Sequence, residues 1–174
     1  MFKPMSVLLA GIEYLISTIG RATLWVALAM IGLVALNVLL RYTFSFGSVW
    51  AQELEWHLLA GMILLGMSYA IQQGDNVRVD LFYAGFSVQK KFIVDLLSVL
   101  LILLVALISL KLSLAYVGQS YAINEQSADP GGFRMRWVVK GLIPLGYGLL
   151  ALQSVGALLR LILDRSQAAE SHHV

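Results

Sequence analysis

The sequence has no cysteine and few charged residues for its length of 174. Without cysteine there is no disulfide, no thiolate metal site and no thiol catalysis, although this absence does not identify the compartment. Only 13% of the residues are Asp, Glu, Lys or Arg, whereas soluble domains carry about 25%. Because 59% are apolar and the mean hydropathy is +0.81, the composition indicates an integral membrane protein.

Clustered basic residues and catalytic motifs are also missing. The net charge is only +2, and Lys and Arg are scattered along the chain, so no nucleic-acid partner is expected. The sequence contains no nucleophile elbow, phosphate-binding loop, metal-binding helix motif or intramembrane carboxylate dyad. We therefore expect a protein that is not an enzyme, binds no cofactor and has membrane lipids as its surroundings.

Four segments are long and apolar enough to cross a bilayer, which takes roughly 20 residues at about 1.5 Å per residue. These spans cover about 22–41, 50–71, 92–111 and 141–160, and basic residues stand at their ends. Long basic side chains at such positions reach the lipid headgroups. The sequence predicts an all-α membrane protein with four transmembrane helices in one integral membrane domain, 1–174, that ends in a polar tail at 165–174.

The N-terminal segment 5–19 has a different pattern. On a helix, Ser6, Glu13, Ser17 and Gly20 form one polar strip, and Leu, Ile, Val and Tyr occupy the rest. This pattern predicts an amphipathic helix that precedes the first span, either lying in the membrane surface or extending that span. A cleaved signal peptide is a further alternative, but no compelling small-residue cleavage site precedes Arg21.

The basic residues in the short connections favour one orientation, with both termini in the cytoplasm. That orientation places seven basic residues on the inner side and five on the outer side. The inner ones are Lys3, Arg21, Arg78, Lys90, Lys91, Arg160 and Arg165, and the outer ones are Arg41, Lys111, Arg134, Arg136 and Lys140.

The entrance of the second span is unusually polar. Trp50, Glu53 and His57 share one helix face, and Glu55 points elsewhere. An ionisable group costs about 2.5–3.5 kcal/mol at the bilayer centre and much less near the interface, where Glu53 lies. We favour structural pairing, with Arg41 as counter-ion, or docking to another subunit. Ion conduction and simple solvent exposure are the alternatives.

Two further features have a simple explanation. Haem ligation by membrane helices usually takes two facing histidines. His57 lies in the second span, but the other histidines, His172 and His173, lie in the tail beyond the last span, so we do not expect a haem site. Pro144 lies inside the fourth span and predicts a kink. Broken helices can mark substrate sites in transporters, but this single break near a helix end favours packing geometry.

An ordered set of short motifs covers nearly the whole chain. "NVLLRYTF" (37–44) ends the first span, Trp50-x-x-Glu53-Leu54 opens the second, and "NVRVDLFY" (76–83) follows it. "KGLIPLG" (140–146) opens the fourth span. This succession resembles the small (Q-type) membrane subunit of the tripartite ATP-independent periplasmic (TRAP) transporters. The candidate subunit-interface or structural residues are Arg41, Tyr42, Trp50, Glu53, His57, Asp80 and Pro144.

The resemblance implies a function as well as a fold. Such transporters import organic anions, typically carboxylates, with a sodium gradient, and a soluble periplasmic protein captures the solute. A large multi-span subunit carries the substrate, and the small subunit braces it in the bacterial inner membrane. The resemblance therefore implies a non-catalytic accessory subunit. The alternative is a membrane anchor of another complex, such as a redox complex.

Overall fold

The computed structural model describes residues 3–74 and 83–171, and every regular element in these ranges is a helix. The helices are α1 (Lys3–Phe44), α2 (Val49–Gln73), α4 (Val88–Ala122), α5 (Arg136–Lys140) and α6 (Leu142–Ser171). Four helical segments are long and apolar enough to cross a membrane, α5 and α6 counting as one. The predicted all-α membrane fold with four spans is confirmed.

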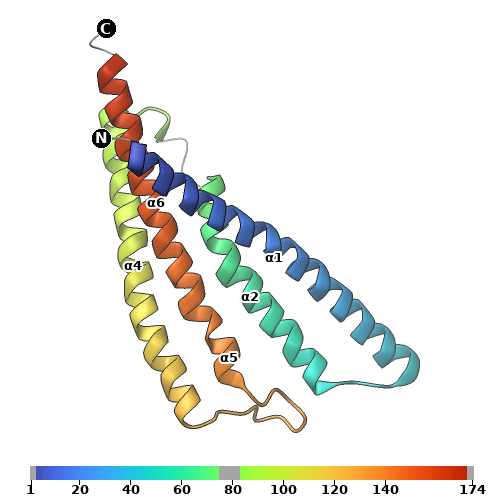
Figure 1. Ribbon diagram of the computed structural model, residues 1–174. Helices are drawn as coiled ribbons and strands as arrows, with labels where there is room; N and C mark the ends of the chain where they lie inside the picture. The colour runs from blue at the N-terminus through green and yellow to red at the C-terminus, as the bar shows by residue number, and fades with distance from the viewer. Residues whose placement is uncertain (1–2, 75–82, 172–174) are drawn as a thin grey trace.

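The helix α6 lies between α4 and α2, and α1 crosses over α6 and α2 at an angle (Figure 1). A small buried cluster consists of Ala106, Leu150 and Ala151, packed against Met67 and Tyr147. It joins α2, α4 and α6. Many large apolar side chains on α1 and α4 are exposed. Such a surface is typical of a protein whose outer faces meet lipid or another apolar partner rather than water.

The segment 5–19 and the first span form one continuous helix, α1, of 42 residues. At about 1.5 Å per residue it is roughly 63 Å long, about twice the thickness of a bilayer core. The segment 5–19 is thus continuous in helix with the first span. The buried residues of α1 include Ile12, Ile16, Gly20 and Thr23, and Gly20, a member of the predicted polar strip, packs against the ring of Tyr69.

The fourth span is interrupted for one residue, Gly141, between α5 and α6, and the kink expected from Pro144 stays a prediction. Pro144 lies in the first turn of α6, where an N–H group has no helical acceptor in any case. In a continuous helix its ring would clash with the carbonyl of the residue four positions earlier, Lys140, and α5 ends at this residue. The proline therefore sets the place of the break.

The first residues of the predicted polar tail are helical, because α6 continues through Ser171. About two turns of residues assigned to the tail thus extend the last helix beyond its apolar part. His172 and His173 lie outside the described residues.

The helices α2 and α6 approach each other closely at Gly146. A Cβ atom at this position would lie 2.7 Å from the backbone oxygen of Leu64 and 2.8 Å from its Cβ. Real Cβ atoms essentially never come so near to backbone, so only glycine fits here unless the helices separate. Small residues at helix contacts in membranes allow this close packing.

We predict that Gly146→Ala lowers the free energy of unfolding by about 1–3 kcal/mol, because the new methyl group forces α6 away from α2. Thermal unfolding of the purified chain in detergent measures the change. Gly148→Ala is the matched control, since a Cβ atom there would meet nothing within 4 Å. It should be neutral or slightly stabilising, because alanine is the better helix former. Equal unfolding temperatures for the two variants would contradict the prediction.

Candidate functional site

The helix α2 begins at a side-chain cap that fixes which residues face inward. Ser48 has an extended backbone, and its hydroxyl accepts a hydrogen bond from the Ala51 N–H (3.4 Å). From this start, Trp50, Glu53 and His57 follow one another at intervals of three and four residues on one face. Glu55 lies on another face, where its carboxylate accepts a hydrogen bond from Asn37 Nδ2 (3.0 Å).

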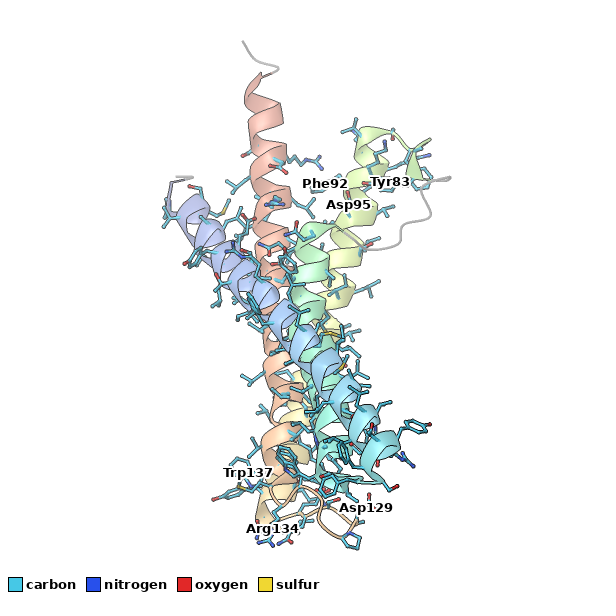
Figure 2. All side chains as sticks on the ribbon, turned by 90° about the vertical axis from the view of Figure 1, so that its right-hand side faces the viewer. Tyr83, Phe92, Asp95, Asp129, Arg134 and Trp137 are labelled. Carbon is cyan, nitrogen blue, oxygen red and sulfur yellow. The ribbon has the colours of Figure 1, made fainter. Side chains whose placement is uncertain are left out.

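The connection between α4 and α5, residues 123–135, is a compact loop with a defined turn. Pro130 and Gly131 stand at the centre of this turn, and the Gly132 N–H donates to the Asp129 carbonyl oxygen (3.0 Å). Gly131 has a φ of 85°, which the third position of a type II turn requires and glycine adopts without strain. Figure 2 shows Asp129 near Arg134 and Trp137, at the end of the molecule opposite Tyr83 and Asp95.

This loop closes over the carboxylate of Glu53, which is only 2% exposed. The Ser127 hydroxyl donates to Oε1, and the Phe133 N–H donates to Oε2 at 2.5 Å. A guanidinium nitrogen of Arg136 lies 3.6 Å from Oε1. We call these four residues the Glu53 clasp. Two donors and a cation satisfy a charge whose burial alone would be costly, and charge-assisted hydrogen bonds are among the strongest in proteins.

An aromatic contact reinforces the Glu53 clasp from the α2 side. The ring of Phe133 stacks on Trp50, with 5.8 Å between centroids and 11° between planes. The same ring lies 5.1 Å from the His57 ring at a tilt of 55°. Gly132 has no room for a side chain, since a Cβ atom there would lie 2.7 Å from Glu53 Oε2. Trp50, Glu53 and His57 were predicted to share a face of α2. All three contact the loop at Phe133.

A second polar contact ties the loop to the following helix. The Lys140 ammonium donates to the Glu125 carboxylate and lies 4.0 Å from the centroid of the Tyr116 ring. The hydrogen bond from Lys140 holds the pKa of Glu125 below its ordinary value of 4.5. Because the pKa is lowered, this contact stabilises the fold above that value and is lost as the pH falls through the folded pKa.

The other predicted site residues lie outside the Glu53 clasp. Arg41 was the expected counter-ion of Glu53, but the cation beside that carboxylate is Arg136, because the loop and not the end of α1 closes over it. Arg41 lines a separate small cavity of about 260 Å³ near the start of α2. Tyr42 is 85% exposed. Asp80 lies outside the described residues.

Sequence reasoning missed three members of the clasp, Ser127, Phe133 and Arg136. The Pro130-Gly131-Gly132 run does predict a turn. It does not predict the helix end on which the turn folds, because Glu53 lies 74 residues from Ser127 and 80 from Phe133. One of the donors is also a backbone N–H, which no pattern of residue types marks.

Comparison with known proteins identifies the family. The family model of the tripartite ATP-independent periplasmic transporters, DctQ component, matches residues 30–164. This chain belongs to the DctQ family. The match includes all four residues of the Glu53 clasp and begins in the middle of α1. No curated protein matches the chain.

Membership of the DctQ family settles the broad class of function. The chain is the small membrane component of a TRAP transporter, a system of three components. The family assignment and the four helices that can span a membrane both indicate a membrane protein of transport. The family assignment argues against the alternative, a membrane anchor of another complex such as a redox complex.

We predict that Glu53→Ala lowers the free energy of unfolding by about 1–3 kcal/mol and loosens residues 123–135, because buried donors lose their acceptor. Hydrogen exchange measured by mass spectrometry should show faster exchange across this loop. Glu55→Ala is the matched control, because it removes a carboxylate from the same helix but makes no contact with the loop in the structure. Unchanged loop exchange in Glu53→Ala would contradict the role of the clasp.

Proposed function

We propose that this chain braces the large transport subunit of a sodium-driven TRAP transporter that imports organic anions, typically carboxylates. In this proposal it lies in the bacterial inner membrane with both termini in the cytoplasm. A periplasmic binding protein captures the solute, and the large subunit carries it. The small subunit is non-catalytic and contributes a fixed helical frame.

The observation that carries the proposal is the Glu53 clasp. Through it the start of α2 is tied to the loop that joins α4 to α5, and this loop continues into α6. The ion pair between Glu13 and Arg160 (2.5 Å) joins α1 to α6 toward the opposite end of the bundle. Polar contacts thus fasten long helices toward both ends, as a rigid brace requires.

Three of the four buried serine side chains also support a scaffold rather than a conduit. Ser68, Ser113 and Ser154 each donate to a carbonyl oxygen of their own helix, at 3.3, 2.9 and 2.8 Å. Such hydroxyls are satisfied without a solute. A path for a hydrophilic anion needs donors or cations that face a shared space at mid-depth. These serines do not supply one.

Uptake by reconstituted vesicles tests the proposal. The large subunit of the same transporter is reconstituted with this chain, without it, and with the Glu53→Ala variant, and the binding protein loaded with a labelled carboxylate is added outside. We expect sodium-dependent uptake only with the small subunit present, and reduced uptake with Glu53→Ala. Solute binding by the soluble protein should not change.

Two results would overturn the proposal. Full uptake by the large subunit alone would remove the need for a brace. Uptake by this chain alone would make it a carrier in its own right. Replacing sodium by potassium in the same vesicles tests the driving ion separately from the bracing role.

A further inference from the structure

The end of α1 carries a basic residue that the contacts of the chain do not use. Arg41 was expected to pair with Glu53, but Arg136 occupies that place. Among the residues that the structure describes, no carboxylate forms an ion pair with Arg41, and its side chain is exposed. Glu55, the other acid near the start of α2, accepts a hydrogen bond from Asn37 instead. The guanidinium group of Arg41 is therefore available to a ligand.

Arg41 lines a cavity of about 260 Å³ between the end of α1 and the start of α2. We call it the Arg41 cavity, and its lining residues are Asn37, Arg41, Gly47, Ser48, Val49 and Gln52. Four of these six side chains carry N–H or O–H donors, and none of the six is acidic. A cavity with one cation, several neutral donors and no carboxylate in its lining suits a small anion that accepts hydrogen bonds.

The turn between α1 and α2 holds the donors of the Arg41 cavity in place. Ser45 has a φ of 51°, and the Phe46 N–H donates back to the Leu40 carbonyl oxygen (3.3 Å), which reverses the chain. The Ser48 hydroxyl then accepts a hydrogen bond from the Ala51 N–H. Because a hydroxyl also has a hydrogen to donate, Ser48 can cap α2 and bind an anion at the same time.

The Arg41 cavity lies level with the lipid headgroups. It stands at the connection between two helices that can each span a membrane, so it lies near a membrane surface. Tyr42 and Trp50, on the two sides of the connection, are exposed. Exposed Tyr and Trp side chains are typical of the membrane–water interface. The anion that is abundant at this level is the phosphate group of phospholipids.

An apolar surface next to the Arg41 cavity distinguishes a phospholipid from a free phosphate ion. Val34 and Val38 are exposed on α1, one turn before Asn37 and Arg41. They continue the same side of the helix from the cavity toward the bilayer interior. A phospholipid brings an anionic group for the cavity and acyl chains for this surface, whereas inorganic phosphate leaves the surface uncovered.

We propose that the Arg41 cavity binds the phosphate group of a membrane phospholipid. The planar fork of Arg41 donates to two phosphate oxygens, and Ser48 and Gln52 add neutral donors. The acyl chains lie along α1 over Val34 and Val38. The bound phosphate thus connects the end of α1 to the start of α2. This inference is independent of the proposed function, because it requires only this chain and the lipid around it.

Native mass spectrometry of the full chain in detergent tests the site. The chain is titrated with phosphatidylglycerol and, separately, with a diacylglycerol that has the same acyl chains but no phosphate. We expect Arg41→Gln to weaken phosphatidylglycerol binding about tenfold, since it removes a charge-assisted hydrogen bond. Binding of diacylglycerol should be weak and equal in both proteins. Gln52→Ala, which removes a neutral donor, should weaken phosphatidylglycerol binding less than Arg41→Gln does.

Arg134→Gln is the matched control. Arg134 is an exposed basic residue at the same end of the molecule (Figure 2), but it does not line the Arg41 cavity. This variant should bind phosphatidylglycerol as the unmodified chain does. Arg41→Gln should unfold at the same temperature as the unmodified chain in lipid-free detergent. Added phosphatidylglycerol should raise the unfolding temperature of the unmodified chain more than that of Arg41→Gln, because a ligand stabilises only the protein that binds it.

Four results would overturn the inference. Equal affinity of the unmodified chain and Arg41→Gln for phosphatidylglycerol would exclude Arg41 from the site. An equal loss in Arg134→Gln would reduce the effect to general surface charge. Displacement of the lipid by inorganic phosphate would assign the site to the free ion. Loss of the Arg41-dependent lipid when the chain is co-purified with the large subunit would give Arg41 a protein partner instead.

Discussion

The burial of one carboxylate organises one end of this protein. Glu53 stands a single turn inside α2, in a helix that is otherwise mostly apolar, and it is almost fully buried. A charge in that position needs hydrogen-bond donors to offset the cost of its burial. The donors come from the loop after α4, so the loop must fold over the start of α2. The stacking of Phe133 on Trp50 follows from that closure.

The bundle is packed unevenly, and this asymmetry is informative. On one side, Gly146 brings α6 against the backbone of Leu64, and Gly20 brings α1 against Tyr69. On the other side, an open groove of about 970 Å³ remains between α2, α4 and α6. Small residues therefore set the close helix contacts, and the space on the other side is not filled by side chains that the structure describes.

The small number of charged residues has a physical reason. In lipid, each ionisable side chain must be paired or placed near an interface. Glu53 and Glu13 are paired with Arg136 and Arg160. The remaining surface of the long helices is left apolar, which suits both lipid and a docked helix.

The sequence by itself determined the class, the four spans and the shared face of Trp50, Glu53 and His57, because hydropathy and helical periodicity are local properties. It also marked the break near Pro144 through the missing N–H of proline. The partners of Glu53 and the course of α1 were decided by the tertiary structure. Arg41 lies nearer to Glu53 in sequence than Arg136 does, yet the loop brings Arg136 to it. Contacts between residues 74 or more positions apart depend on how the helices pack, which local patterns do not contain.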